Sequence, residues 1–202
     1  MKTLLSLFCT LGIVPYALKA AEPISTLTMT NLQAAFDGES NAHSRYLAFA
    51  EKADAEGYAG VASLFRAAAR AEEIHAGNHA AVIVNFGGVP HAKLEDAIVK
   101  STRENLEAAL KDETYERDEM YPAFIRQAEA ETNPQALQTL RFALAAEVEH
   151  AKLYAEALGD MEDMKLSRVF YVCPVCGFTA AKPDFEGCPT CATPKERFEQ
   201  VS

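Results

Sequence analysis

Extended runs of Thr, Val and Ile are scarce in this sequence of 202 residues, whereas Ala, Glu and Leu are abundant. This composition favours helices over sheets. Positive charge is also in short supply, with 19 basic against 29 acidic residues and a net charge of −10. A chain this acidic is not expected to bind nucleic acid or an anionic membrane surface. A small neutral substrate or a basic redox protein is the more suitable partner.

The apolar run near the N-terminus is too short to span a membrane. Lys2 provides a positive start, residues 4–14 form the apolar run, and Ala20 precedes the expected mature start at Ala21. This pattern predicts a secretory signal peptide over residues 1–20. The alternative is a membrane anchor, against which Pro15 and the short run both argue. We therefore expect an exported protein of the bacterial periplasm, with no membrane span after cleavage.

Four long stretches with helical periodicity follow, over residues 30–56, 58–86, 101–131 and 134–158. Short turns at Gly57 and at Thr132-Asn133 would fold them into two antiparallel hairpins. The longer segment 87–100 can cross from one hairpin to the other, and a short helix is possible within 91–100. The prediction is an all-α domain over residues 21–165, a four-helix bundle of two αα-hairpins with one crossover.

An internal repeat supports this division. Residues 31–40 recur as 105–114, and residues 71–76 recur as 146–151. The bundle is therefore expected to use one αα-hairpin twice. A site carried by the hairpin should then occur twice in the molecule.

Acidic residues and histidines occupy positions where the helical periodicity requires core residues. Buried carboxylates that face one another repel, and each costs several kcal/mol to desolvate. A pair of divalent or trivalent cations would remove both problems. One Glu from each of two helices and a Glu-x-x-His from each of the other two is the ligand pattern of di-iron bundles. The matching residues are Glu39, Glu113, the pair Glu72 and His75, and the pair Glu147 and His150.

Some of these residues have other possible interpretations. A single Glu-x-x-His on a helix is usually solvated surface, but two in register with a repeat argue against that. Glu116 corresponds to Ala42 in the repeat, so it is either an extra ligand or a partly exposed acid. His43 and His79 lie one turn from the expected ligands and are interpreted as groups at the edge of the site. Tyr46 and Tyr121 are interpreted as core residues.

The composition changes from Val169 onward, where Cys, Pro, Gly and aromatic residues replace Ala and Glu. This short tail cannot hold a hydrophobic core unaided. Its four cysteines form two Cys-x-x-Cys pairs separated by eleven residues: Cys173, Cys176, Cys188 and Cys191. Such pairs predict one tetrahedral site for iron or zinc. Two disulfides are the alternative, and thiol–disulfide exchange is a weaker one because no βαβ pattern surrounds the motif.

Several motifs together resemble rubrerythrin. They are Gly38-Glu39-Ser40 with Arg45-Tyr46, Ala71-Glu72-Glu73-Ile74-His75, Glu113-Thr114-Tyr115-Glu116, Ala146-Glu147-Val148-Glu149-His150 and Cys188-Pro-Thr-Cys191. The resemblance covers nearly all of the expected mature chain. It implies a ferritin-like di-iron domain, a rubredoxin-like domain over residues 166–202, and a non-haem peroxidase that reduces hydrogen peroxide to water in defence against oxidative stress.

The resemblance also assigns roles. The implied di-iron ligands are Glu39, Glu72, His75, Glu113, Glu116, Glu147 and His150, and those of a single iron are Cys173, Cys176, Cys188 and Cys191. Glu116 and His75 would exchange as ligands when the redox state changes. Electrons would pass between two subunits of a head-to-tail dimer, so a homodimer or higher oligomer is expected.

The best-known relatives are cytoplasmic and receive electrons from a cytoplasmic donor, whereas this chain has a predicted signal peptide. The protein that donates electrons to an exported form is therefore unidentified. Two other functions are compatible with the residues. One is a ferroxidase or iron-handling bundle that oxidises Fe(II) with O₂. The other is a non-enzymatic electron carrier or redox sensor.

Overall fold

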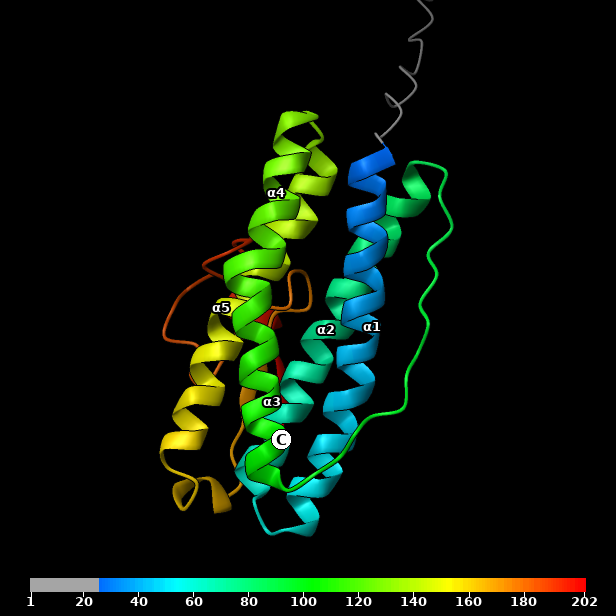
Figure 1. Cartoon of the computed structure of the whole chain (residues 1–202). Helices are drawn as coiled ribbons and strands as arrows, with labels where there is room; N and C mark the ends of the chain where they lie inside the picture. The colour runs from blue at the N-terminus through cyan, green and yellow to red at the C-terminus, as the bar shows by residue number, and fades with distance from the viewer. Residues whose placement is uncertain (1–25) are drawn as a thin grey trace, which may run out of the picture.

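The computed structural model describes residues 26–202 and shows two hairpins packed side by side as a four-helix bundle (Figure 1). The predicted signal peptide lies outside the described residues. Within residues 26–202, no helix is both long and apolar enough to cross a membrane. The elements of the bundle are α1 (Thr26–Ala55), α2 (Ala59–Asn85), α3 (Thr102–Tyr115), the π-helix η1 (Glu116–Met120), α4 (Tyr121–Ala130) and α5 (Pro134–Gly159).

The helix ends follow local sequence signals. Gly57 and Gly87 both adopt φ +80°, a left-handed conformation that ends α1 and α2 and is cheap only for glycine. Ser101 and Glu104 form a reciprocal capping box at the start of α3. Asn133 caps α5 by accepting a hydrogen bond from the Ala136 amide at 2.9 Å, and a proline occupies the first turn. These ends place both hairpins close to their predicted positions.

The crossover segment contradicts one prediction. The short helix considered for residues 91–100 does not form, and this described segment runs extended along α1 (Figure 1). Backbone amides of this segment donate hydrogen bonds to side chains of α1 instead of to the backbone carbonyls that a helix would use. The Lys93 amide donates to Asp37 Oδ1 at 2.6 Å, and the Glu95 amide donates to Asn41 Oδ1 at 2.9 Å. The crossover is therefore held straight by polar groups of a neighbouring helix.

The helix predicted over 101–131 is helical throughout but contains the π-turn η1. The repeat explains its position. Glu39 corresponds to Glu113 and Tyr46 corresponds to Tyr121, and the second hairpin has one extra residue between these two points. A π-turn accommodates one additional residue without breaking the helix. The insertion thus falls next to Glu116, where the repeat symmetry is also broken.

Aromatic side chains fill the core on one side of the acidic residues. Tyr46, Phe49, Phe65 and Tyr154 are buried, and their ring centroids lie 5.4 to 6.2 Å apart in tilted or edge-on contacts. Such pairs add to the stability that burial alone provides. These rings fill the bundle beside the residues that face its centre.

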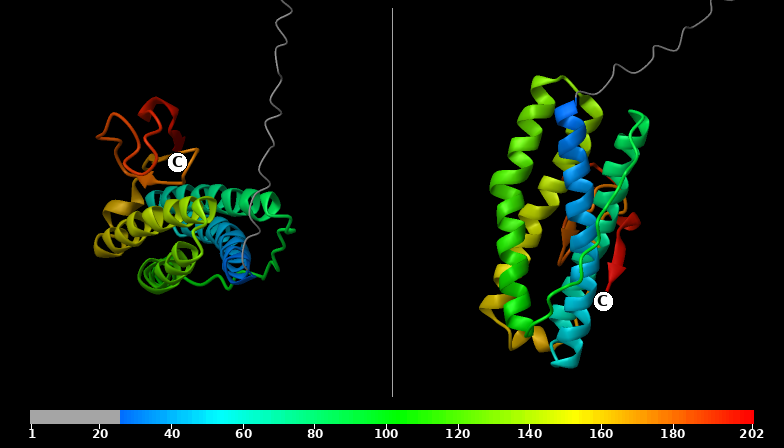
Figure 2. Two further views of the ribbon diagram at one scale, coloured as in Figure 1. Left: turned by 90° about the horizontal axis from the view of Figure 1, so that it is seen from above. Right: turned by 45° about the vertical axis from the view of Figure 1, so that its right-hand side comes forward.

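The tail is a small antiparallel sheet with strand order β2-β1-β3. Its elements, with the preceding turn, are η2 (Asp163–Lys165), β1 (Phe170–Val172), β2 (Thr179–Ala180), η3 (Lys195–Arg197) and β3 (Glu199–Val201). It lies against α2 and α5 on the outside of the bundle (Figure 2). The predicted boundary between residues 165 and 166 falls between η2 and β1.

Candidate metal centre

Six of the seven predicted di-iron ligands meet in the middle of the bundle. Each is at most 1% exposed: Glu39 on α1, Glu72 and His75 on α2, Glu113 on α3, Glu147 and His150 on α5. They form two groups, and within each group the potential ligand atoms lie within 4.8 Å of one another. One group is Glu39, Glu72, His75 and Glu147; the other is Glu72, Glu113, Glu147 and His150. Because Glu72 and Glu147 belong to both groups, they are placed to bridge two cations.

Both histidines direct Nδ1 towards the carboxylates. His75 Nδ1 lies 2.9 Å from Glu72 Oε2 and 3.2 Å from Glu147 Oε1. His150 Nδ1 lies 2.8 Å from Glu147 Oε2 and 3.3 Å from Glu72 Oε1. The arrangement is therefore nearly symmetric about the two shared acids, as the repeat predicts.

Burial and mutual repulsion perturb the acids of this cluster. Burial, followed by the charges of Glu72 and Glu147, raises the pKa of Glu39. Burial also raises the pKa of Glu147, with Glu72 adding to the effect. Burial opposes ionisation of Glu72 too, but the neighbouring imidazoles of His150 and His75 outweigh it and lower its pKa to about 2. Ionisation of these buried acids is thus costly unless a cation balances their charge.

The donor set fits bound cations. Among residues 26–202, four buried carboxylate oxygens of this cluster have no hydrogen-bond partner: Glu39 Oε2, Glu72 Oε1, Glu113 Oε2 and Glu147 Oε1. An unpaired buried carboxylate oxygen is costly, and a metal ion satisfies it. Carboxylate and imidazole together suit iron.

The four tail cysteines also form one group. Their sulfur atoms lie within 4.8 Å of one another, with Cys173 and Cys191 Sγ 3.5 Å apart and Cys176 and Cys188 Sγ 3.4 Å apart. A disulfide has sulfur atoms about 2.05 Å apart, whereas a tetrahedral site with metal–sulfur bonds of about 2.3 Å has edges of about 3.8 Å. The alternative of two disulfides is not adopted, because all four cysteines are free.

Comparison with known proteins identifies the family. A family model described as rubrerythrin matches residues 30–158, which include all seven predicted di-iron ligands. The chain belongs to the rubrerythrin family. Its members are di-iron oxidoreductases, and its cofactors are two non-haem iron ions in the carboxylate–histidine site and one iron or zinc ion in the four-cysteine site.

Individual rubrerythrin relatives match along most of the chain. Nigerythrin of Nitratidesulfovibrio vulgaris is 40% identical over 172 residues, which cover 85% of each protein. Rubrerythrin-2 of Clostridium acetobutylicum is 36% identical, with 87% of this chain and 97% of the relative covered. A structure of fully reduced, all-ferrous nigerythrin superposes with a TM-score of 0.80 at 37% identity, with 91% and 90% covered. The predicted ferritin-like bundle with a rubredoxin-like tail is thus confirmed.

Two tyrosines donate hydrogen bonds to acids of the rubrerythrin site. The sequence analysis predicted them as core residues and did not predict this role. Tyr46 donates a hydrogen bond to Glu113 Oε1 at 2.5 Å, and Tyr121 donates one to Glu39 Oε1. Both are core residues, as predicted, but each also orients an acid on the other hairpin. The two tyrosines occupy corresponding positions of the repeat, and this correspondence is the signal that could have revealed their role.

His79 supports one of these tyrosines. Its Nε2 lies 3.3 Å from the Tyr121 hydroxyl, and its Nδ1 lies 2.9 Å from Thr139 Oγ1. Burial lowers the pKa of His79 to about 3, so the ring is neutral near pH 7. Because Tyr121 gives its proton to Glu39, its oxygen accepts from His79 Nε2. His43 instead joins α1 to α2, with Nδ1 2.7 Å from the Ala69 carbonyl oxygen.

Glu116 lies outside both four-residue groups. It is half-buried at the first position of η1. Burial raises its pKa, and the charges of Glu113 and Glu147 raise it further. The structure therefore places Glu116 beside the site but does not bring it among the other predicted ligands.

The tail reaches the same site, which sequence reasoning did not predict. His75 Nε2 donates to the Cys176 carbonyl oxygen at 3.1 Å. His150 Nε2 lies 3.1 Å from Thr179 Oγ1, whose proton goes to the Gly177 carbonyl at 3.0 Å. Each histidine thus carries its proton on Nε2 and leaves the Nδ1 lone pair for a cation.

Proposed function

We propose that this chain is a peroxidase that reduces hydrogen peroxide to water in defence against oxidative stress. One peroxide, two electrons and two protons give two water molecules. When bound, two ferrous ions would supply the two electrons. The observation that carries the proposal is the pair of ligand groups that share Glu72 and Glu147, because it would hold two redox ions side by side.

The residues of the chain would supply the rest of the chemistry. Glu39, Glu72, Glu113 and Glu147 would balance most of the metal charge, while Tyr46 and Tyr121 hold two of these acids in place. The ligands are almost fully buried, so the site would admit only a small molecule. Glu116, with its raised pKa, is suited to hold a proton on its carboxyl group for the water that leaves.

The test is to mix the reduced, iron-loaded mature protein anaerobically with hydrogen peroxide and to follow the iron–thiolate absorbance of the tail. Rapid return of the oxidised colour with peroxide, and much slower return with O₂, would support the peroxidase. Faster reaction with O₂ would instead indicate the ferroxidase. Fast reversible reduction with negligible peroxide turnover would indicate an electron carrier or sensor, and a tail without this colour would indicate zinc.

The cellular setting is also part of the proposal. The predicted signal at residues 1–20 suggests that the protein works outside the bacterial cytoplasm and takes electrons from a donor protein there. We propose that the chain forms a homodimer or a higher oligomer. A mature protein that begins at Ala21 in the periplasmic fraction would support export, and retention of residues 1–20 in the cytoplasm would contradict it. Light scattering of the mature protein measures the oligomeric state.

A further inference from the structure

A buried chain of hydrogen bonds leads from Glu39 away from the metal centre. Tyr121 donates to Glu39 Oε1, and His79 Nε2 lies 3.3 Å from the Tyr121 hydroxyl. On the other side of the ring, His79 Nδ1 lies 2.9 Å from Thr139 Oγ1. The first three side chains are at most 1% exposed, and Thr139 is 5% exposed. Three side chains therefore connect a predicted metal ligand with the edge of the core.

All hydrogens of this chain point towards Glu39. The phenol proton of Tyr121 is used in the bond to Glu39, so the Tyr121 oxygen accepts from His79 Nε2. Burial lowers the pKa of His79 to about 3, and the neutral ring carries only one proton. His79 Nδ1 is then an acceptor, and its donor is the Thr139 hydroxyl. Each hydrogen bond thus fixes the direction of the next one.

The outer end of the chain reaches a groove between α2 and α5. Thr139 lines this groove, which has a volume of about 390 Å³. Asn78, Asn85, Gln135 and Gln138 contribute amide side chains to its wall. A polar groove of this size can hold water, and the Thr139 oxygen has lone pairs that can accept a hydrogen bond from it. The chain therefore runs from a source of protons to the metal centre.

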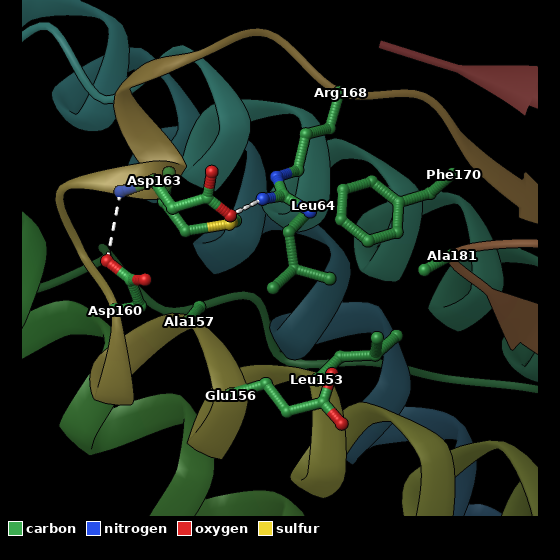
Figure 3. Close-up of a pocket in the computed structure, with 10 residues that line it drawn as sticks. Leu64, Leu153, Glu156, Ala157, Asp160, Asp163, Arg168, Phe170 and Ala181 are labelled. Carbon is green, nitrogen blue, oxygen red and sulfur yellow. Dashed lines mark hydrogen bonds and ion pairs between the residues drawn. The ribbon is translucent and has the colours of Figure 1, made fainter.

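The internal repeat relates this groove to a second cavity, of about 180 Å³ (Figure 3). In the repeat, Leu64 corresponds to Thr139 and Leu153 corresponds to Asn78. Both leucines line the second cavity, together with Phe170 of the tail. Apolar side chains thus occupy the positions at which the groove has a hydroxyl and an amide.

The hydrogen-bond chain is also interrupted at its corresponding inner positions. Tyr154 corresponds to His79, and Tyr46 corresponds to Tyr121. The Tyr154 hydroxyl has no hydrogen-bond partner among residues 26–202, although its ring centroid lies 5.8 Å from that of Tyr46. Leu64, the next residue outward, can neither donate nor accept a hydrogen bond. A nearly symmetric site therefore has a polar path on one side and a closed aromatic core on the other.

We propose that Thr139, His79 and Tyr121 pass protons from the groove between α2 and α5 to Glu39. This rests on the proposed function, in which one peroxide consumes two protons. In one passage, Thr139 takes a proton from solvent and gives its own to His79 Nδ1. His79 gives its Nε2 proton to Tyr121, which gives its own to Glu39, and from there the proton goes to a peroxide oxygen. No member of the path changes its net charge, because each gives one proton as it receives another.

One passage supplies one of the two protons that a peroxide consumes. The carboxyl group of Glu116, to which a proton was assigned above, supplies the other. The passage leaves His79 protonated on Nδ1, so the ring and the two hydroxyl groups return to their starting arrangement before the next turnover. The path is therefore suited to deliver one proton per turnover.

The first test locates the protons without using activity. The mature protein is loaded with zinc in place of iron, and ¹⁵N NMR then reports the tautomer of His79, whose signals are absent in His79→Gln. Expected is the Nε2–H tautomer, with an Nε2 proton that exchanges with water roughly tenfold or more slowly in Thr139→Val than in the wild type. Thr139→Ser, which keeps the hydroxyl, should exchange like the wild type. Protonation on Nδ1 in the wild type, or equal exchange in Thr139→Val, would overturn the proposal.

The second test measures proton delivery during a single turnover of the reduced, iron-loaded protein with hydrogen peroxide. Thr139→Val should slow peroxide reduction by roughly tenfold or more, and D₂O should slow this variant by a larger factor than the wild type. Thr139→Ser should restore both readouts. Bundle iron content should stay unchanged, because Thr139 belongs to neither ligand group. A wild-type rate in Thr139→Val, or a slowed variant with the wild-type isotope effect, would overturn the proposal.

A matched control removes a buried hydroxyl that lies outside the path. Ser63 is 1% exposed and donates to the Ala59 carbonyl oxygen of its own helix at 2.9 Å. Ser63→Ala should therefore leave the proton exchange and the isotope effect unchanged. If the wild-type protein does not turn over peroxide, the proposed function fails. The zinc-loaded protein still decides the path, since slowed exchange in Thr139→Val supports it and equal exchange overturns it.

Discussion

The two hairpins carry the same ligands, and each also completes the other. Tyr46 of the first hairpin binds Glu113 of the second, and Tyr121 of the second binds Glu39 of the first. The ends are reciprocal as well: Thr102 donates to Glu56, and Thr28 donates to Glu131. Glu39 and Glu113 are therefore each oriented by a tyrosine of the other hairpin. The two copies of the repeat are thus joined by reciprocal hydrogen bonds and do not form two independent units.

The hairpins differ beside the ligands rather than among them. Glu116 and η1 in the second hairpin correspond to Ala42 and continuous α-helix in the first. His79 corresponds to Tyr154, and His75 contacts a cysteine of the tail whereas its counterpart His150 contacts Thr179. The two ligand groups are thus nearly symmetric, and the differences between the hairpins lie in the residues around them.

The largest effect is expected from removal of a shared acid. Glu72→Ala or Glu147→Ala should lower iron binding in the bundle and reduce peroxide turnover by roughly a hundredfold or more, because each acid serves both ligand groups. The tail should keep its metal, as measured by its thiolate absorbance and by metal analysis. Glu73→Ala, which removes an exposed neighbouring acid, is the control. Full turnover in either variant would refute the site assignment.

Glu116→Ala makes the second hairpin resemble the first. Both four-residue groups remain complete, so bundle iron content should stay unchanged. Turnover should fall by about ten- to a hundredfold, because an acid beside the metals is lost. Metal analysis and stopped-flow kinetics provide the two readouts. Loss of iron from the variant would instead make Glu116 an obligatory ligand.

Removal of a tyrosine hydroxyl should destabilise the protein more where the hydroxyl donates to an acid of the site than where it has no partner. Tyr46→Phe leaves a buried Glu113 oxygen without its donor and should lower the free energy of unfolding by about 1.5–3 kcal/mol. Tyr154→Phe should change it by less than about 1 kcal/mol, because the Tyr154 hydroxyl has no hydrogen-bond partner within residues 26–202. Urea denaturation of the metal-free protein measures both. Equal losses would show that ring packing, rather than the reciprocal bond, matters at Tyr46.

The smallest effect concerns the contact between the hairpin ends. Hydrogen bonds from the Thr102 hydroxyl and amide lower the pKa of Glu56 from 4.5 to about 2. Because the folded-state pKa lies below the unfolded one, this stabilisation is complete above pH 4.5 and is lost as the pH falls towards 2. Glu56→Gln should therefore weaken the pH dependence of unfolding in this window. Glu51→Gln on the same helix is the control, and identical pH profiles for Glu56→Gln and wild type would contradict the contact.

Much of the fold was predictable because its signals are local. Gly57 and Gly87 mark helix ends, and the spacing of Glu72 and His75 puts both on the inward face of one helix. The crossover was not predictable, since side chains of α1 hold its backbone extended. The second hairpin has one extra residue, which the π-turn accommodates. Its position can be located only when the two repeats are aligned so that Tyr46 corresponds to Tyr121.

The sequence by itself determined the helices, the duplication, six converging ligands and the four-cysteine group. Periodicity and short spacings set these features, and neighbours along the chain suffice to specify them. Only the tertiary structure decided that each hairpin orients the acids of the other and that the tail contacts His75. Such contacts join residues up to 101 positions apart, and their geometry depends on how all the helices pack together.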